Sequence, residues 1–505
     1  MISTTFALGV LCFAFYILFQ IQSRCRHLRN AKAQQCKPPV FVNPGAYGIS
    51  SFLEMLKEVK KGRFVEYIAG HYPKYGTTFQ LRRLVRTPIF TIEPENIKAI
   101  LATKFDSFSL GTRLREFYPL LGDGIFTLDG GGWSHARRLL RPQFKKEQIA
   151  DIELLESHVS NFLKLIPVDG SVFDIQRLFF LLTMELATLF LFGEAVGCMS
   201  TDDGLQSLSP NGPKTQEFAE AFNIAQGYLL GRTRAQAFYW LINPSEFREA
   251  ICQVHKIVDY YVDCAIKSRE SQAEPMRYIF SNALAADTDE PKVLRDNMLN
   301  ILLAGRDTTA SLLSSTFFFL SRHPTVWSKL RQAIFDEFGD AQSPKKRISQ
   351  SALKNIIYLR YTLNEVLRLL PPVPLNYRVA TRDTFLPLGG GADGKFPVYI
   401  RKGQVVNYSV YAMHRRTDLW GSDASEFRPE RWKENAKRGW EFLPFNGGPR
   451  ICLGQQYALT EASYTIVRIM QRFSTIICGD LNITEPVIHA SLTLSHANGV
   501  MVTMS

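Results

Sequence analysis

The chain is poor in cysteine and lacks the linkers that usually separate domains. Its 505 residues include eight cysteines, and none of them forms a CxxC pair. That spacing excludes the common zinc clusters, and a chain of this length needs no disulfide staples, so we expect a reducing compartment. No internal repeat is present, and no Ser/Gly-rich or charge-rich stretch follows about residue 50. These absences exclude repeat architectures and predict one large globular domain.

Acidic residues are missing from the N-terminal segment. Residues 1–37 contain no Asp or Glu, and Ile2–Ser23 is uncharged and mostly apolar. At ~1.5 Å per residue, that run just spans the ~30 Å hydrocarbon core of a bilayer. A cleaved signal peptide would carry its positive charge before the apolar run, whereas the basic residues here follow it and keep the body in the cytosol. We therefore predict a transmembrane anchor over 1–23, a basic and proline-rich connector over 24–49 and a globular domain over 50–505.

Apolar residues at three- and four-residue spacing predict a mainly α fold with small β-sheets. The predicted helices span 93–103, 133–149, 151–166, 174–193, 213–231, 244–270, 293–322, 324–338, 355–369 and 453–473. Strands are predicted within 77–92 and 384–410, with a short pair within 476–503. The polar segment 196–216 is too short for a linker and is expected to be a surface loop.

The letters GGGADG (389–394) match the G-x-G-x-x-G pattern of dinucleotide-binding folds. That pattern works only between a strand and a helix whose N-terminus meets the pyrophosphate. The residues that follow, KFPVYIRKG, contain proline and are typical of a strand. We therefore predict a glycine-rich hairpin loop here and no nicotinamide site, so that any electrons must come from elsewhere.

Cys452 has an unusual position, behind the glycines and proline of 447–449 and just ahead of Gly454 and a long apolar-periodic run. A thiolate ligates metals, and its charge must be stabilised. Glycines let the backbone wrap closely around the sulfur, and a helix N-terminus favours an anion. Phe445 is placed to cover the sulfur and Arg450 to direct a cation at it. Together these features describe an axial haem ligand, whereas the alternative is a small buried cysteine in a glycine-rich turn.

The run FNGGPRICLG (445–454) resembles the cysteine loop of the cytochrome P450 family, the haem-thiolate monooxygenases. Every fixed position of the family pattern F-x-x-G-x-R-x-C-x-G is filled. The resemblance covers roughly residues 38–505 and implies the cytochrome P450 fold, a single large haem domain behind the anchor. It also implies haem b as cofactor, Cys452 as its axial iron ligand, and electrons that reach it from NADPH only indirectly, through a separate reductase.

AGRDTT (304–309) lies midway along a predicted apolar helix. Gly305 removes a side chain, which lets a flat cofactor or small ligand approach, and Asp307 and Thr308 place an acid and an alcohol beside that gap. A polar step in the helix is the structural alternative, although polar groups inside a helix usually need a partner. The resemblance implies that Thr308 holds water and that Asp307 supplies protons for cleavage of the O–O bond.

Glu365 and Arg368 are three residues apart on a predicted helix and therefore share one face. Alone, such a pair is most often an ordinary surface ion pair that contributes little. Together with FRPERW (427–432), it resembles the Glu-Arg-Arg arrangement of the family, made here of Glu365, Arg368 and Arg431. The resemblance implies a structural role, in which the three side chains secure the loop that carries the cysteine.

Trp133 and Arg137 are four residues apart and share a helix face. The resemblance implies that this pair grips a haem propionate and that Arg450 grips one as well. It also suggests that His414 lies near a propionate. His135 points about 200° around the helix from Trp133, so we expect a solvent or loop contact for it and no metal ligation.

Arg138, Arg141 and Lys145 follow one another at helical spacing. A charge stripe is usually a solvated face. The resemblance places this stripe beside the proximal side of the haem, where an NADPH-dependent reductase, and cytochrome b5 as a further partner, would dock through acidic surfaces. Both interpretations stay open, since an electrostatic patch steers encounter without specifying the partner.

Within the family, the chain is closest to the fungal microsomal branch that hydroxylates alkanes and fatty acids. LLGDGIFTLDG (120–130), AGRDTT, the GGGADG insertion, the extended cysteine loop and SHANGV (495–500) carry that resemblance. It implies monooxygenation of a C–H bond in a lipophilic substrate by O2, at the endoplasmic reticulum membrane, with no nucleic-acid partner. The aromatic run AFYWLI (237–242) is either a bilayer contact or part of the core.

Three rival functions share parts of this pattern. A tailoring oxidase for a fungal terpenoid or polyketide would share every motif. A reductase-independent haem-thiolate isomerase or dehydratase could dispense with Asp307 and Thr308, which argue against it. A haem sensor or carrier would need neither a proton relay nor a pocket for substrate.

Overall fold

The computed structural model describes residues 2–43, 45, 48–84, 86–144, 152–199, 215–270, 278–434, 438–483 and 485–505. The chain divides into two compact units, each assembled from segments far apart in the sequence. The first unit comprises Met1–Lys57, Tyr67–Ser109 and Asn376–Ser409, and the second comprises Glu58–Glu66, Leu110–Leu375 and Val410–Ser505. The sequence patterns do not predict this division.

The first unit is built on a six-stranded mixed sheet with the order β1-β2-β3-β9-β6-β4. Strands β1/β2 and β3/β9 pair in parallel, whereas β2/β3 and β4/β6 pair antiparallel. The strands are β1 (Val40–Val42), β2 (Thr78–Leu81), β3 (Ile89–Thr91), β4 (Phe108–Ser109), β6 (Leu375–Ala380) and β9 (Val405–Ser409). The N-terminal helices are α1 (Ile2–Ala33), α2 (Ile49–Lys60), α3 (Phe64–Ala69), α4 (Tyr72–Tyr75) and α5 (Pro94–Lys98), with a π-turn over Ala99–Thr103.

The glycine-rich letters 389–394 form the turn of an antiparallel hairpin between β7 (Thr384–Gly390) and β8 (Phe396–Ile400). At Gly390 an added Cβ would lie 2.5 Å from the carbonyl oxygen of Lys37, so only glycine fits there. The chain continues from the turn into a strand. The predicted hairpin is therefore confirmed.

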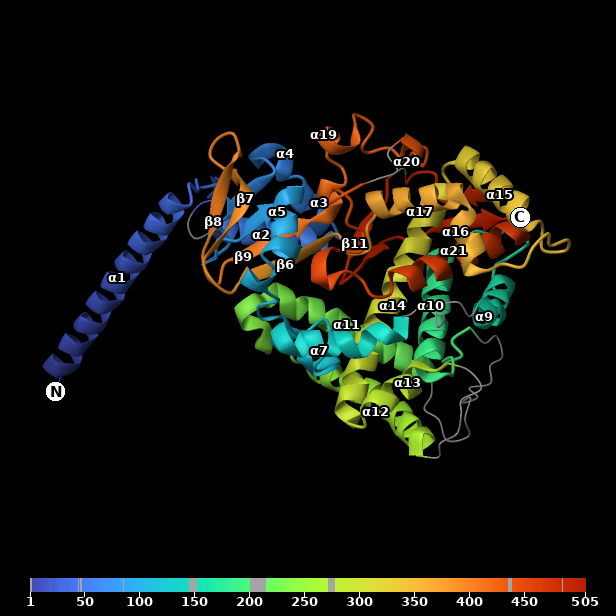
Figure 1. Cartoon of the computed structure of the whole chain (residues 1–505), viewed down its shortest axis with the longest axis horizontal. Helices are drawn as coiled ribbons and strands as arrows, with labels where there is room; N and C mark the ends of the chain where they lie inside the picture. The colour runs from blue at the N-terminus through green and yellow to red at the C-terminus, as the bar shows by residue number, and fades with distance from the viewer. Residues whose placement is uncertain are drawn as a thin grey trace. The chain divides into compact units, whose positions relative to one another are not determined.

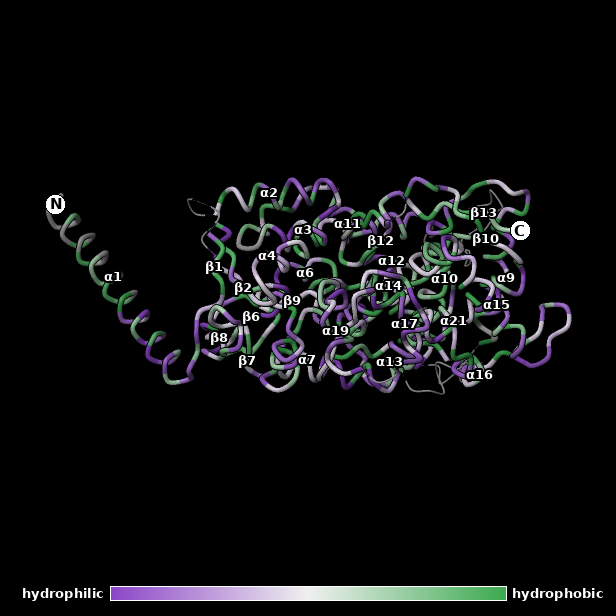
Figure 2. The backbone as a smooth tube through the Cα atoms, turned by 90° about the horizontal axis from the view of Figure 1, so that it is seen from above, coloured by the Kyte–Doolittle hydropathy of each residue, from purple (hydrophilic) through white to green (hydrophobic). Residues whose placement is uncertain are grey.

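Helix α1 continues to Ala33, past the predicted end of the anchor at residue 23. The reason is local, because residues 24–33 contain neither glycine nor proline and the first proline is Pro38. Large apolar side chains on this helix are exposed, among them Phe6, Leu8, Leu11, Phe15 and Leu18. The hydropathy colouring changes from apolar to polar toward the C-terminal end of the helix (Figure 2).

The second unit is mainly helical. Its longer helices are α6 (Arg113–Leu121), α7 (Gly130–Leu140), α9 (Ile152–Lys164), α10 (Ile175–Phe192), α11 (Thr215–Ala235), α12 (Ser245–Glu270), α13 (Phe280–Asp287), α14 (Pro291–Leu320), α15 (Pro324–Phe338), α17 (Ile357–Leu369) and α21 (Gln455–Arg472). Shorter ones are α16 (Gln350–Asn355), α18 (Val410–Met413), α19 (Thr417–Trp420) and α20 (Arg431–Glu434). Small sheets complete the unit, β10-β13-β5 and β11-β12. Their strands are β5 (Phe173–Asp174), β10 (Ile476–Cys478), β11 (Ile488–Ala490), β12 (Leu494–His496) and β13 (Met501–Met504).

Helix α14 is the long central element of the second unit, and it packs along α10 (Figure 1). Pro291 opens it at a position where the missing backbone N–H costs nothing. Most of its side chains are buried on every side, which is typical of a core helix. Helix α10 is long and apolar enough to cross a membrane, yet 72% of it is buried inside the protein, so it too is a core helix.

The helices predicted from the sequence are present with small shifts at their ends. The helix predicted over 133–149 starts earlier, at Gly130, and gives way to a 3-10 turn at Arg141. Its last residues, 145–149, and most of the predicted surface loop 196–216 lie outside the described residues. The prediction of a mainly α fold with small β-sheets is confirmed.

Candidate active site

The loop from Phe445 to Gly454 holds Cys452 against its own backbone. The Cys452 N–H donates to the carbonyl oxygen of Phe445 at 3.0 Å, which closes the loop. At Gly447 an added Cβ would lie 2.7 Å from the ring of Trp440, and Gly448 adopts a φ of +65°, so both positions favour glycine. Helix α21 begins directly after Gly454, as the sequence predicts.

The sulfur of Cys452 is surrounded by protein, but the side chain keeps an exposed surface. Burial raises the pKa of the thiol, while the Gly454 N–H and the positive charge of Arg137 lower it. The thiol is thus enclosed on the protein side and open on another. No group of three or more His, Cys, Asp or Glu side chains within the described residues forms a site for a bare metal ion. A lone sulfur of this kind fits a metal that brings its other ligands with it, as iron does in haem.

Two arginines lie near the indole ring of Trp133. The Cζ atom of Arg450 is 4.5 Å from the ring centroid, and that of Arg137 is 5.9 Å from it. Burial lowers the pKa of the Arg137 guanidinium, and the neighbouring Cys452 raises it. The structure therefore brings together the predicted residues Trp133, Arg137, Arg450 and Cys452 in one positively charged neighbourhood.

Arg450 is also fixed by hydrogen bonds. It donates to the carbonyl oxygens of Ile125 at 3.1 Å and Leu128 at 2.8 Å, and it forms an ion pair with Asp129 at 2.9 Å. These partners belong to the loop that precedes α7. The sequence analysis missed these contacts, and two of the three are to backbone carbonyls, which carry no residue signature.

Gly305 on α14 leaves open space beside the helix. A Cβ added there would meet no atom within 4 Å. The neighbouring Thr308 hydroxyl donates to the carbonyl oxygen of Ala304 at 2.7 Å, which keeps the oxygen lone pairs available as acceptors. A flat cofactor or a small ligand fits beside this stretch of helix.

Asp307 is buried and has two polar neighbours. The side-chain amide of Gln226, on α11, donates to its carboxylate, and the Nη1 atom of Arg306 lies 3.6 Å from the same carboxylate. Gln226 Oε1 and Arg306 Nε are buried and have no hydrogen-bond partner among the described residues. The sequence analysis missed Gln226. The sequence carries no signal for it, because the burial of Gln226 beside Phe222 and Leu229 appears only once the helices are packed.

Glu365 lies between two buried arginines. Its carboxylate accepts two hydrogen bonds from Arg368, at 2.8 and 2.9 Å, and one from Arg431 at 2.8 Å. Trp432 Nε1 donates to the same carboxylate at 3.0 Å. Arg368 also donates to the carbonyl oxygen of His414 at 2.9 Å. The structure therefore joins the three residues of the predicted Glu-Arg-Arg arrangement in a fully paired network.

His414 uses both ring nitrogens within the protein. Its Nδ1 lies 3.1 Å from the carbonyl oxygen of Arg368, and its Nε2 accepts from the Leu443 N–H at 2.9 Å. Burial lowers the pKa of His414 to about 3, so the ring is neutral, with its proton on Nδ1. Neither ring nitrogen is therefore left to bind a propionate, and the prediction that His414 lies near one stays a prediction. His414 links Arg368 to the segment that leads into the cysteine loop.

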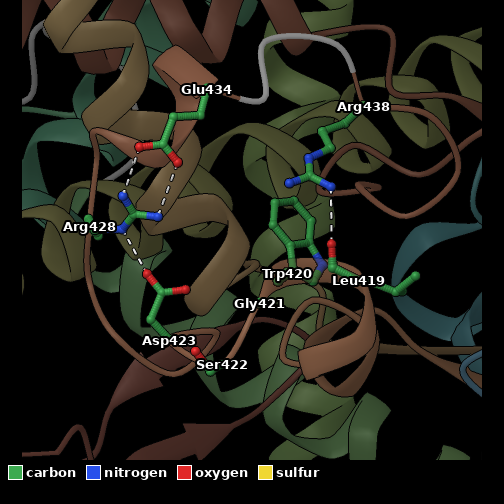
Figure 3. A pocket seen from close by; sticks show the side chains of 8 residues that line it. All are labelled: Leu419, Trp420, Gly421, Ser422, Asp423, Arg428, Glu434 and Arg438. Carbon is green, nitrogen blue, oxygen red and sulfur yellow. Dashed lines mark hydrogen bonds and ion pairs between the residues drawn. The ribbon is translucent and has the colours of Figure 1, made fainter.

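A pocket of about 470 Å³ lies beside this network (Figure 3). Arg428 bridges Asp423 at 2.7 Å and Glu434 at 3.1 Å along its wall, and Arg438 donates to the carbonyl oxygen of Leu419. The lining is charged and largely paired, and it contains none of the predicted site residues. We therefore assign this pocket no part in the active site.

The basic stripe is solvent-exposed where it is described, at the end of α7 and in the 3-10 turn that follows it. Arg138 and Arg141 are exposed, and Arg138 lies 3.3 Å from Nδ1 of the exposed His135. The exposure of His135 agrees with the predicted solvent or loop contact. Lys145 lies outside the described residues.

Comparison with known proteins assigns the chain to a family. The family model for cytochrome P450 matches residues 44–502. The chain is 48% identical over 480 residues to cytochrome P450 52A3-A of Candida maltosa, which covers 93% of this chain and 91% of that protein. It is 47% identical to cytochrome P450 52A6 of Candida tropicalis over 97% of this chain and 95% of that protein. It is also 47% identical to cytochrome P450 52A12 of Debaryomyces hansenii, over 93% of this chain and 92% of that protein. The chain therefore belongs to the cytochrome P450 family and is a haem-thiolate monooxygenase.

Proposed function

We propose that this enzyme hydroxylates a long-chain lipophilic substrate, a fatty acid or an alkane, and that Cys452 is the iron ligand. Membership of the family establishes haem b as cofactor, O2 as co-substrate and NADPH as the electron source through a redox partner. The substrate class is supported by the similarity to 52A proteins along nearly the whole chain and by the motifs shared with alkane and fatty-acid hydroxylases. The observation that carries the proposal is the loop-held thiol of Cys452, open on one side.

Bound haem supplies the iron at which O2 is activated. The protein must then stabilise a thiolate at Cys452, and it offers the Gly454 N–H, the N-terminus of α21 and the charge of Arg137 for that purpose. Trp133, Arg137 and Arg450 are the residues we assign to the propionates. Arginine binds carboxylates through paired N–H donors, and two of these residues are arginines.

Asp307 and Thr308 are the proposed catalytic residues of α14. The Thr308 hydroxyl can accept a hydrogen bond from water while it donates to Ala304. Asp307 can pass a proton between its carboxylate and such a water, because a carboxylate both accepts and releases protons. Gln226 and Arg306 hold that carboxylate in place. The acid and the alcohol argue against an isomerase, which needs no proton delivery of this kind.

Helix α1 supports a single-pass anchor in the endoplasmic reticulum membrane, with the catalytic domain in the cytosol. Its exposed apolar side chains, over an uncharged run, match the environment of a lipid bilayer. In the second unit, Phe238, Trp240 and Leu241 are exposed in the 3-10 turn Gln236–Leu241. Exposed aromatic side chains of this kind favour a membrane interface, from which a lipophilic substrate would enter.

A reductase with an acidic surface is the proposed electron donor, with cytochrome b5 as a second one. Arg138 and Arg141 are exposed and positively charged, which suits them to such a partner. Replacing both by glutamate should slow reduction by the reductase at low salt and change the spectrum of the oxidised enzyme little. An unchanged reduction rate would leave the stripe as a solvated face.

The test of the proposed function begins with the spectrum of the reduced, carbon-monoxide-bound protein. A red-shifted band typical of thiolate ligation is expected, and Cys452→Ala should abolish it. Fatty acids, alkanes and polycyclic metabolites are then compared by the spectral shift they cause. A shift with polycyclic metabolites alone would favour a tailoring oxidase, and turnover without NADPH and reductase would favour an isomerase.

A further inference from the structure

Two side chains of α14 hold the loop that connects α6 to α7. Asp296 accepts the backbone N–H of Asp123 at 2.8 Å. One turn further along α14, Asn300 accepts the backbone N–H of Phe126 at 3.1 Å and donates to the carbonyl oxygen of Leu121 at 3.0 Å. Asp296 and Asn300 are almost completely buried. Lys292, one turn before Asp296, also donates to the carboxylate of Asp123 at 2.7 Å. The loop and the last residue of α6 are thus hydrogen-bonded to one face of α14.

The glycines of this loop are there because the two side chains come so close. At Gly122, whose φ is +55°, an added Cβ would lie 2.1 Å from the carboxylate of Asp296. At Gly124 it would lie 2.3 Å from the side-chain amide of Asn300. No larger residue fits at either position without moving the loop away from α14. The close contact with α14 therefore explains the two glycines of the GDG stretch at 122–124.

The same loop also binds Arg450. The carbonyl oxygens of Ile125 and Leu128 accept from Arg450, and Asp129 pairs with it. Helix α7 begins at the next residue and carries Trp133, whose ring lies against Arg450. A short and continuous series of contacts thus runs from α14 through the loop to the residues assigned to the haem propionates.

We infer that Asp296 and Asn300 are positioning residues for the propionate-binding set formed by Trp133, Arg137 and Arg450. They fix the loop on α14, and the loop fixes Arg450 and the start of α7. This inference rests on the proposed function, since it assumes that these residues grip the propionates. Buried groups that orient the direct ligands of a metal or cofactor act in this way in other sites.

The test compares two substitutions of the same type on one helix. Asn300→Leu removes both bonds to the loop. Asn297→Leu is the matched control, because Asn297 is also buried but its amide donates within α14, to the carbonyl oxygen of Val293. Two quantities are measured on the purified haem-loaded proteins, the rate of haem transfer to apomyoglobin and the hydrogen exchange of the 121–129 peptide.

Asn300→Leu is expected to release haem about tenfold faster or more and to lose exchange protection in the loop. Asn297→Leu should stay within about twofold of the unsubstituted protein. Equal effects of the two substitutions, or an unchanged rate for Asn300→Leu, would overturn the inference. If Asn300→Leu purifies without haem, Asp296→Ala takes its place, because alanine removes the acceptor of the Asp123 N–H. A faster release is then expected, and an unchanged rate would count against the inference.

A double substitution separates positioning from general weakening. Arg450→Lys changes the residue at which the contacts from α14 through the loop end. If Asn300 acts through Arg450, the double variant releases haem little faster than the faster single variant. Additive effects would overturn the inference. The failure of this inference can be told apart from failure of the proposed iron ligand, because the latter shows as a missing thiolate band in the unsubstituted protein.

Discussion

The side-chain amide of Gln226 on α11 donates a hydrogen bond to the carboxylate of Asp307 on α14. The two residues are buried and come from helices that are distant in the sequence. The proposed proton donor is therefore held by a residue outside its own helix. This relationship gives the first prediction.

Gln226→Leu should lower the fraction of NADPH consumption that yields product by about fivefold. The reason is that a hydrogen bond to a carboxylate contributes about 1 kcal/mol or more to its positioning. The measurement is product formed per NADPH oxidised, with reductase present. Asn223→Leu, an exposed amide on the same helix, is the control and should leave the ratio unchanged. Equal ratios in all three proteins would remove Gln226 from this role.

Thr308→Ala should uncouple NADPH consumption from product, with product formation reduced by about a hundredfold or more, as is usual for lost proton transfer. Thr309→Ala is a close control, because the buried Thr309 hydroxyl has no hydrogen-bond partner among the described residues. The measurement is hydrogen peroxide released alongside product. Similar uncoupling in both variants would mean that Thr308 has no specific role in proton transfer.

Arg431→Met should destabilise the fold by about 3–5 kcal/mol, because it removes one partner of a buried ion pair with Glu365. Arg428→Met, three residues earlier, removes one partner of a half-exposed pair and should cost about 0–1 kcal/mol. Urea unfolding followed by circular dichroism gives both values. A small cost at Arg431 would show that the network is not what secures this segment.

Because Glu461 is buried, we expect the stability of the protein to fall as the pH rises. Burial raises the pKa of its carboxyl from 4.5 to about 8. The folded chain therefore holds a proton that the unfolded chain releases, and stability falls as the pH rises from about 4.5 to 8. Its Oε1 also has no hydrogen-bond partner among the described residues.

Glu461→Gln should remove this dependence and stabilise the protein at pH 8 by about 1–3 kcal/mol. Unfolding in urea at pH 6 and pH 8 measures it, with Glu249→Gln at an exposed position as control. A difference between pH 6 and pH 8 that persists in Glu461→Gln would assign the effect to other groups.

The sequence predicts those parts of the site that are contiguous in the chain. The loop around Cys452 is one, because its glycines, its arginine and the following helix are adjacent letters. Trp133 and Arg137 are another, since helical spacing alone puts them on one face. The family resemblance adds Glu365 and Arg431, which no local pattern connects.

The remainder depends on how helix faces meet, and single-chain patterns do not contain that information. Gln226 and Asn300 look like ordinary polar residues in their helices, and only packing reveals their partners. His414 is expected near a propionate, but the structure engages both of its ring nitrogens with backbone atoms. Helix α1 runs past the predicted anchor because no breaker intervenes in residues 24–33.

The neutral ring of His414 has a consequence for acid tolerance. Burial keeps the pKa of His414 near 3, and that of His496 likewise, whereas both would bind protons near pH 6.5 once the chain unfolds. Lowering the pH below that value therefore lowers the free energy of unfolding, because only the unfolded chain can bind these protons. One of these rings, that of His414, holds the segment that leads to Cys452. Mild acid is therefore expected to release the haem before the outer helices unfold.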